Sequence, residues 1–525
     1  MTDYGLASLV VAGVPETILL LLPYWFIPPR FRATIFIVLG WSAIWFTANI
    51  LYFRNFGDVL SVEAIEMTEN LNGFVVDSAI HSFRIVDLIF FLPTCLLIIV
   101  YALYFRRSVT AKDSTFGRLT KLYALTISII IIVLWQGFLL YRDYREEVSP
   151  LEHLTDFTRV KRSGIIRSYG YIHYMLLDIY HTIRSPYIPL GDDRLKIEHY
   201  IKSRYTAAKS DDESCRHTPP NLILIIVESL NSDAITIEYS GKQIAPHLQR
   251  LLADSSVFRA LNVKQMAGIG RSSDGQFIYN TGLLPTTDRV TAFTYGNADY
   301  PSIAKALGIN AEEIIGEGRA LWNHASTSRS YGYNHLHDIT ELPDYRKSES
   351  DSMIFNRAIA YVDSVKTPFM LEITTLSMHQ PYLENDYPAG EIRDAIGNNE
   401  RAYYLESVNY FDRQLNRFIN HLDQAGILES CVIALASDHI APLQLTTGAT
   451  AYDLTFILLN GPKGGTANGE ILQTDLYPTL LYAMGRTDYF WQGVGRNLFI
   501  ESSKATPVDS ARHISDLIIK GGFFR

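Results

Sequence analysis

Four short segments of the chain hold side chains that can bind a cation or attack an ester. They are VES at 227–229, GIGRSSDG at 268–275, SMHQPY at 377–382 and SDH at 437–439. Each alone is weak, because an acid after a strand usually caps a helix, and a stretch rich in Gly, Ser and Asp is usually a turn. Together they offer four candidate metal ligands of mixed oxygen and nitrogen type, Glu228, Ser272, Asp438 and His439. Such a set suits Mn²⁺, Mg²⁺ or Zn²⁺.

Ser272 is the candidate nucleophile of this set. A metal ion in contact with a serine hydroxyl makes it a stronger attacking group by favouring loss of its proton. We expect the backbone N–H groups of the turn at 268–270 to approach an anion, and the metal and Arg271 to balance the charge of a phosphate. His379 could donate a proton to a leaving alcohol or hold the head group of the substrate.

An alternating pattern of strands and helices surrounds these segments. Short apolar runs that read as buried strands occur at 221–227, 369–374, 431–436 and 455–459. Helix-like stretches occur at 245–253, 300–307, 400–425 and 474–484. This alternation predicts an α/β domain with a mainly parallel sheet covered by helices on both faces. Ligands bind such sheets at the carboxyl ends of the strands, which is where Glu228 and the SDH segment lie.

The composition narrows the class of protein further. The chain has 525 residues, a net charge of −9 and 48% hydrophobic residues. The acidic balance argues against nucleic acid as a partner, since phosphate backbones attract clustered Lys and Arg. Three cysteines without a CxxC pair exclude a scaffold built on disulfides; Cys215 and Cys431 could form a disulfide in an oxidising compartment or remain two buried thiols. A hydrophobic fraction this high is unusual for a soluble enzyme, so we expect part of the chain to lie in a membrane.

Four apolar runs precede the α/β part, at 6–27, 33–53, 85–105 and 122–141. Each is close to the roughly 20 residues that a helix needs to cross a bilayer. The last three lack the polar stripe that a helix of a soluble bundle would show. The first contains Pro15 and Glu16, which leaves open a full span or a shallow, re-entrant segment.

The charges of the loops predict the orientation of these spans. Basic residues follow the first run and separate the third from the fourth, whereas acidic residues fill the loop between the second and the third. By the positive-inside tendency, the basic loops are cytoplasmic and everything after residue 141 is external. We therefore predict a transmembrane bundle of four spans (1–145), a juxtamembrane helical connector (146–218) and an extracytoplasmic catalytic domain (219–525). The connector either lies on the membrane or packs against the catalytic domain.

The segments NLILIIVES, GIGRSSDGQF, LWNH, SMHQPY and SDH, followed by QTDLYPTLLYAMG, resemble the lipoteichoic acid synthase/phosphoglycerol transferase family. The resemblance lies in their order and spacing over about residues 219–500. That family is part of the sulfatase-like branch of the alkaline phosphatase superfamily. The resemblance implies a multi-pass helix bundle in the bacterial cytoplasmic membrane, followed by an alkaline phosphatase/sulfatase-like domain on the periplasmic or extracellular side. It also implies one divalent cation, Mn²⁺ foremost, bound by the four ligands named above.

The same resemblance implies a two-step transfer. Ser272 would attack the phosphodiester of a phospholipid donor such as phosphatidylglycerol and release diacylglycerol, and a glycan or glycolipid acceptor would then take the phosphoglycerol from the serine. His379 matches a histidine that binds the head group, and Trp322 matches a tryptophan near the same pocket. With Arg271 and His324, they are the candidate substrate-binding residues.

The chain departs from the family pattern in ways that keep alternatives open. The nucleophile is serine where the best-known members have threonine, and His324 stands where members have arginine. A phosphoethanolamine transferase of the same superfamily is one alternative, and a phosphodiesterase or sulfatase is another. Sulfatases need a C/S-x-P-x-R context around the nucleophile, which the stretch at 272–275 lacks. A domain that binds without turnover would be expected to have lost a ligand, and all four are present.

Overall fold

The computed structural model describes residues 34–56, 59–60, 83–100, scattered positions within 123–141, 166, 170–183, 187–210, 219–342, 350–380, 382, 391–397, 399–441, 453–500, 503–504 and 506–525. The chain divides into two compact units, Met1–Ser185 and Pro186–Arg525. The apolar run at 6–27, the charged loops used to predict the orientation, and Cys215 lie outside the described residues. The predicted domain boundaries at 145/146 and 218/219 remain predictions.

The described part of the first unit is helical. Its elements are α2 (Ile35–Phe56), the 3₁₀ helix η4 (Ile85–Phe91), α5 (Leu92–Val100) and α9 (Tyr171–Ile183). Asn49 of α2 donates to the hydroxyl of Tyr171 of α9 over 3.2 Å, which ties distant parts of the chain together. Among the described segments, none combines the length and the apolar character that a bilayer-spanning helix requires.

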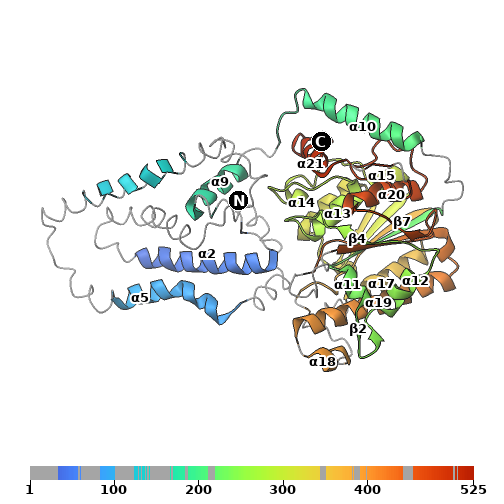
Figure 1. The fold of residues 1–525 in the computed structure, drawn as a ribbon, viewed down its shortest axis with the longest axis horizontal. Helices are drawn as coiled ribbons and strands as arrows, with labels where there is room; N and C mark the ends of the chain where they lie inside the picture. The colour runs from blue at the N-terminus through green and yellow to red at the C-terminus, as the bar shows by residue number, and fades with distance from the viewer. Residues whose placement is uncertain are drawn as a thin grey trace. The chain divides into compact units, whose positions relative to one another are not determined.

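The second unit is built on one large sheet (Figure 1). Over the described residues its strands follow the order β10-β4-β9-β8-β1-β7-β5-β6, and β11 also pairs with β4. The strands are β1 (Asn221–Val227), β4 (Phe258–Lys264), β5 (Asn310–Ile315), β6 (His335–His337), β7 (Phe369–Thr374), β8 (Cys431–Ser437), β9 (Asp453–Leu459), β10 (Gly465–Thr466) and β11 (Ile471–Leu472). Only β9 among them runs antiparallel to its neighbours, β8 and β4, so the predicted mainly parallel sheet is confirmed.

Helices cover both faces of this sheet (Figure 1). One face carries α13 (Ser272–Thr281), α14 (Thr291–Thr294), α15 (Ile303–Leu307), α20 (Leu476–Ala483) and α21 (Val508–Lys520). The other carries α11 (Ser232–Thr236), α12 (Pro246–Ala253), α17 (Ser350–Val362) and α19 (Glu400–Gln424). The remaining elements are α10 (Asp193–Ser210), the hairpin β2 (Glu238–Tyr239) and β3 (Lys242–Gln243), η6 (Leu321–Asn323), α16 (His324–Tyr331), η7 (Ile339–Glu341), α18 (Glu391–Ile396), η10 (Leu428–Ser430) and η12 (Gln473–Asp475).

The central strands are buried along their whole length. All seven residues of β1 and all seven of β8 are buried, as expected for parallel strands covered on both faces. Helix α10, inside the predicted connector, packs on this unit: Ile197 belongs to its main core, and Tyr200 bonds to Thr506 over 2.6 Å. At least this part of the connector therefore packs against the globular domain.

Candidate active site

The candidate site lies where three parallel strands end. β1 is flanked by β8 on one side and β7 on the other, and Val227 is paired with Ser437 in register. Glu228 and Asp438 therefore leave the sheet side by side, and the Asp438 N–H still donates to the Val227 carbonyl over 3.1 Å. The register of two neighbouring strands thus brings together residues that are far apart in sequence.

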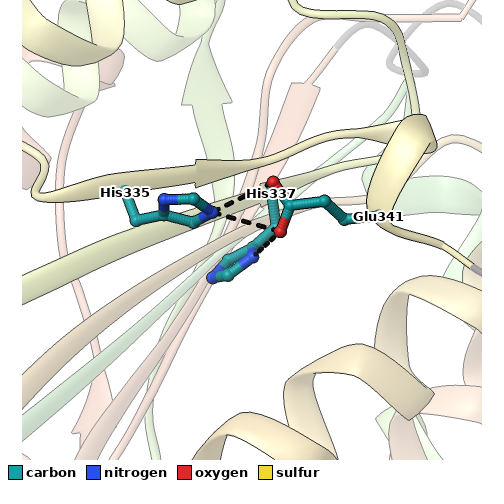
Figure 2. A group of neighbouring side chains, drawn as sticks. All are labelled: His335, His337 and Glu341. Atoms are coloured by element: carbon teal, nitrogen blue, oxygen red, sulfur yellow. Dashed lines mark hydrogen bonds and ion pairs between the residues drawn. The ribbon is translucent and has the colours of Figure 1, made fainter.

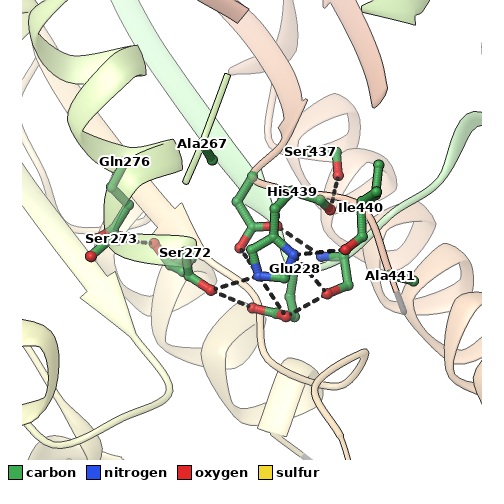
Figure 3. A network of polar contacts seen from close by, with 12 residues as sticks. Glu228, Ala267, Ser272, Ser273, Gln276, Ser437, His439, Ile440 and Ala441 are labelled. Atoms are coloured by element: carbon green, nitrogen blue, oxygen red, sulfur yellow. Dashed lines mark hydrogen bonds and ion pairs between the residues drawn. The ribbon is translucent and has the colours of Figure 1, made fainter. Parts of the chain in front are cut away.

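Three of the predicted metal ligands contact one another at this edge of the sheet (Figure 3). The Ser272 hydroxyl donates to Glu228 Oε2 over 3.0 Å and lies 3.2 Å from His439 Nε2. His439 Nε2 lies 3.6 Å from Glu228 Oε1 and 3.7 Å from Asp438 Oδ2. One ligand atom each from Glu228, Asp438 and His439 lies within 4.8 Å of the other two. All four predicted ligands therefore share one small volume.

The hydrogen bonds define the protonation of His439. Its Nδ1 lies 3.0 Å from the Ile440 carbonyl, which can only accept, so Nδ1 carries the hydrogen and the lone pair of a neutral ring sits on Nε2. Burial, with the charge of Arg271 as a further cause, lowers the pKa of His439 to about 4 and keeps the ring neutral. The Nε2 lone pair is thus directed at Ser272 and the carboxylates.

The two carboxyl groups lack the counter-charge that their burial calls for. Burial and the charge of Asp438 raise the pKa of Glu228, and burial raises the pKa of Asp438 to about 6. Asp438 Oδ2 is buried and has no hydrogen-bond partner among the described residues. A divalent cation would bind this oxygen, offset both charges and accept the Nε2 lone pair. The residues fit such an ion, and their mixed oxygen and nitrogen donors do not distinguish Mn²⁺ from Mg²⁺ or Zn²⁺.

The loop before Ser272 is shaped by a carboxylate within its own helix. Asp274 Oδ2 accepts the N–H groups of Gly268 and Gly270, each over 2.9 Å. A Cβ on Gly270 would lie 2.3 Å from Asp274 Oδ1, so this close approach requires glycine. The prediction that these N–H groups bind a substrate anion is therefore wrong, because an internal acid already occupies them. Sequence reasoning missed Asp274, although an acid in the first turn of a helix is a typical capping signal.

Arg271 directly precedes Ser272, the candidate nucleophile. Its backbone has φ +48°, in the region that side chains other than glycine rarely adopt, and it immediately precedes the first residue of α13. No described residue forms a hydrogen bond or ion pair with its guanidinium. Ser272 is half-buried, whereas Ser273 and the rest of the helix are buried, so the hydroxyl and the cationic group remain accessible together.

Several residues that the sequence analysis did not select hold the site in shape. Ser229, with φ +50°, donates its hydroxyl to Glu228 over 2.6 Å and its N–H to Asp438 over 2.8 Å. Gln473 accepts from Ala267 over 2.9 Å and donates to the Asp438 carbonyl over 2.7 Å, joining the nucleophile loop to β8. No sequence motif identifies Gln473, because its role depends on contacts that form only in the folded chain.

His379 lies in the loop after β7. Asp351 of α17 accepts the N–H groups of Leu376 and Ser377 over 2.8 and 3.0 Å, which fixes this loop. His379 Nδ1 lies 2.6 Å from the Gln380 carbonyl oxygen. The charge of His379 is among the causes that act on the pKa of Glu228. The predicted head-group histidine therefore belongs to the same electrostatic neighbourhood as the four ligands.

Trp322 and His324 occupy a separate segment after β5. Trp322 has φ +48°, and its ring centroid lies 5.9 Å from that of Phe293. His324 is buried, with its ring nitrogens 4.0 Å from Glu313 and 3.7 Å from Glu317. Within the described part of the chain, no hydrogen bond or ion pair joins either residue to the four ligands. Their predicted role in substrate binding stays a prediction.

A serine, two carboxylates and a histidine at the carboxyl edge of a helix-covered, mostly parallel sheet define an α/β enzyme domain of the sulfatase type. The family model "Sulfatase" matches residues 220–516, and the chain belongs to this family as a lipoteichoic acid synthase-like member of the alkaline phosphatase superfamily. The model "Lipoteichoic acid synthase N-terminal domain" matches residues 8–187. The chain is thus an enzyme of the sulfatase-like family.

Curated relatives extend over most of the chain. Lipoteichoic acid synthase 2 of Bacillus subtilis is 24% identical over 481 residues, which cover 85% of this chain and 71% of the relative. Lipoteichoic acid synthase of Staphylococcus aureus is 23% identical over 537 residues, covering 94% of this chain and 80% of the relative. The similarity therefore includes the N-terminal region as well as the catalytic domain.

Solved structures give more distant likenesses. The lipoteichoic acid synthase LtaP from Listeria monocytogenes has a TM-score of 0.49 at 19% identity, covering 54% of this chain and 78% of that chain. The Streptococcus pyogenes phosphoglycerol transferase GacH, in complex with sn-glycerol-1-phosphate, has a TM-score of 0.46 at 13% identity, covering 62% of this chain and 91% of that chain.

Proposed function

We propose that the protein is a membrane-anchored, metal-dependent transferase that moves phosphoglycerol from a phospholipid to a cell-surface glycan or glycolipid. The observation that carries the proposal is the accessible Ser272 hydroxyl, 3.0 Å from Glu228 Oε2 and 3.2 Å from His439 Nε2 at the start of α13. The lipoteichoic acid synthases among the relatives support this substrate class.

Glu228, Ser272, Asp438 and His439 would hold one divalent cation, with Mn²⁺ foremost. When bound, the cation would supply Lewis acidity at the serine oxygen and at the phosphate. Side chains of the protein carry out the remaining roles. Arg271 balances the negative charge of the phosphate, which also meets the positive end of the α13 dipole. His379 donates a proton to the leaving oxygen of diacylglycerol.

The transfer takes place in two balanced steps. Ser272 gives its proton to water, its oxygen forms a bond to phosphorus, the bond between phosphorus and the diacylglycerol oxygen breaks, and that oxygen takes the proton of His379. An acceptor hydroxyl then gives its proton to His379 and attacks the same phosphorus, the bond to Ser272 breaks, and the serine oxygen takes a proton from water. The serine and His379 are thus both restored at the end of the cycle, and the acceptor leaves with phosphoglycerol.

The proposal includes anchoring by the N-terminal region, with the catalytic domain outside the cytoplasmic membrane. The apolar runs at 33–53, 85–105 and 122–141, and the match to a lipoteichoic acid synthase N-terminal domain, support it. An active site held near the bilayer suits a donor that is itself a lipid. The domains would be those given by the sequence, 1–145, 146–218 and 219–525.

Mass spectrometry of the Ser272 peptide tests the proposal. The purified full-length chain is incubated with mixed phospholipids and Mn²⁺, quenched and digested. We expect a phosphoglycerol adduct on Ser272, which Ser272→Ala abolishes. Ser273→Ala is the matched control, because Ser273 is buried and its hydroxyl donates to the Gly270 carbonyl over 2.7 Å. This variant should still form the adduct.

Other outcomes replace the proposal with a named alternative. A phosphoethanolamine adduct on Ser272 would identify a phosphoethanolamine transferase. Hydrolysis of a phosphodiester or sulfate ester without any transfer to an added alcohol would identify a hydrolase. Bound metal with neither adduct nor turnover would identify a binding domain.

A further inference from the structure

We propose that His335, His337 and Glu341 form a second metal site, suited to an imidazole-preferring divalent cation such as Zn²⁺. The site lies on β6, the edge strand of the sheet, where β6 pairs with β5. β6 is three positions from β1 in the sheet, about 14 Å at the usual strand spacing. The second site is therefore separate from the candidate active site.

Strand geometry brings the two imidazoles together (Figure 2). His335 and His337 are two residues apart on one strand, so their side chains leave the same face. Glu341, at the end of the short helix η7, turns back toward both rings. His335 Nε2 lies 3.0 and 3.1 Å from the two carboxylate oxygens of Glu341, and His337 Nδ1 lies 2.6 Å from Oε2.

His337 needs hydrogens on both ring nitrogens to serve its two carboxylate neighbours without a metal. Nδ1 lies 2.6 Å from Glu341 and Nε2 lies 2.6 Å from Glu312, and ionised carboxylates only accept. Such a ring is positively charged. Arg357 Nη2 lies 3.0 Å from Nδ1 and 3.4 Å from Nε2 of the same buried ring, so this charge would lie beside a guanidinium.

A cation between Nδ1 and Glu341 would let the ring stay neutral. The Nδ1 lone pair and the Glu341 carboxylate then both bind the metal, and Nε2–H donates to Glu312. A ligand histidine whose other nitrogen donates to a carboxylate is the usual arrangement in metal sites. The charges around the cluster also favour a cation, since its three carboxylates outnumber its two guanidiniums. The carboxylates are those of Glu312, Asp338 and Glu341, and the guanidiniums are those of Arg319 and Arg357.

The ligand set and its spacing point to zinc-like ions. Two imidazoles and one carboxylate suit Zn²⁺, and a three-ligand site leaves a position for water. Tetrahedral bonds of about 2.1 Å would place ligand atoms about 3.4 Å apart. The carboxylate of Glu341, now 2.6–3.1 Å from the imidazole nitrogens, therefore needs to move away from them by under about 1 Å. His335 is half-exposed, with 48% of its side chain accessible, which gives an ion a way in from solvent.

The turn that carries Glu341 is held in place before any ion binds. Asp338 accepts from Thr340 N–H over 3.1 Å, and its carboxylate receives Arg319 Nε over 2.8 Å and Nη2 over 3.1 Å. The N–H of Arg319 also donates to Asp338 over 3.0 Å.

Metal stoichiometry of the full-length chain tests the second site. Protein stripped by a chelator is titrated with Zn²⁺, and the bound metal is counted by mass spectrometry. The Asp438→Asn background removes the first candidate site, so the remaining Zn²⁺ reports on the second. We expect one equivalent in that background, lost on adding His335→Ala. Glu312→Gln, which removes the partner of His337 Nε2, should weaken binding by about 10–100-fold.

His421→Ala is the matched control for the loss of a histidine. His421 pairs with Asp363 over 2.7 Å on the surface and has no second imidazole in that pair, so this variant should keep the equivalent. The visible absorption of bound Co²⁺ gives a second readout in the wild type, and its tetrahedral bands should weaken with His335→Ala. The second site is refuted if the Asp438→Asn chain binds no Zn²⁺, or if His335→Ala leaves the wild-type stoichiometry and Co²⁺ bands unchanged. Because bound metal is counted, neither result depends on phosphoglycerol transfer.

Discussion

One added methyl group at Gly275 should separate Ser272, the candidate nucleophile, from the other candidate metal ligands. Gly275 lies in α13, three residues after Ser272, and packs directly on the end of β8. A Cβ at this position would lie 2.8 Å from the Asp438 Cβ and carbonyl oxygen and 2.9 Å from its Cα. These are backbone atoms and a Cβ, so no flexible side chain can rotate away. Gly275→Ala therefore forces α13 and Asp438 apart.

The size of the effect can be worked from these contacts. Unstrained carbon atoms lie about 3.5–4.0 Å apart, so the helix and the strand end must separate by about 1 Å. Such overpacking lowers the free energy of unfolding by about 1–3 kcal/mol. Replacing a helical glycine by alanine raises the free energy of unfolding by about 1 kcal/mol, because alanine has the higher helix propensity. The net loss of stability is then about 0–2 kcal/mol. A 1 Å misplacement of a reacting group can reduce the rate about 100-fold. Turnover should therefore fall far more than stability.

The assay compares turnover of a fluorescent phosphatidylglycerol with the melting temperature of the same preparation. Gly40→Ala is the matched control, because Gly40 also lies in a helix and no described atom lies within 4 Å of its added Cβ. This control should keep full turnover. If Gly275→Ala kept wild-type turnover as well, α13 would not need its present distance from Asp438, and our account of the site would be wrong.

Three further substitutions and one labelling experiment probe the site and its surroundings. Glu228→Gln should weaken Mn²⁺ binding at least about tenfold by isothermal titration, and unchanged affinity would remove Glu228 from the ligand set. His379→Ala should reduce turnover by about 100-fold with the metal retained, and full activity would make His379 purely structural. Burial raises the pKa of Cys431 to about 11, so maleimide labelling of its peptide should stay slow up to about pH 9 and become fast in denaturant; fast native labelling would contradict its burial. Tyr333→Phe removes a 2.6 Å hydrogen bond to the buried Glu372 and should cost about 1–3 kcal/mol by thermal unfolding, whereas an unchanged melting temperature would show that Glu372 does not need this donor.

The sequence predicted the strands that are buried on both faces and missed those that are not. The runs at 221–227 and 369–374 match β1 and β7 residue for residue, because uninterrupted apolar residues are needed there. β5 (NAEEII) was missed because Glu312 and Glu313 interrupt its apolar pattern, and each carboxyl has a histidine within 4.0 Å. β6 is an edge strand of three residues with one apolar side chain, too short for a periodic signal.

The residues of the candidate site were easier to predict than the contacts that hold them. Glu228 and Asp438 follow apolar strands, so their convergence followed from parallel pairing. Asp274 lay within a quoted segment, but its capture of the glycine N–H groups depends on loop geometry that spacing does not encode. The pairing of His335 and His337 with Glu341 could not be predicted, because the strand that aligns the two rings was itself missed.

The attachment of the loop at 268–270 to Asp274 separates two tasks within the enzyme. The loop that leads to the Ser272 hydroxyl is held by the bonds of Gly268 and Gly270 to Asp274, which need no bound lipid. The segments after β5 and β7, which carry Trp322 and His379, contribute nothing to those bonds. Under the proposed function, we therefore expect substitutions in these two segments to change the head-group preference while Ser272 keeps its position.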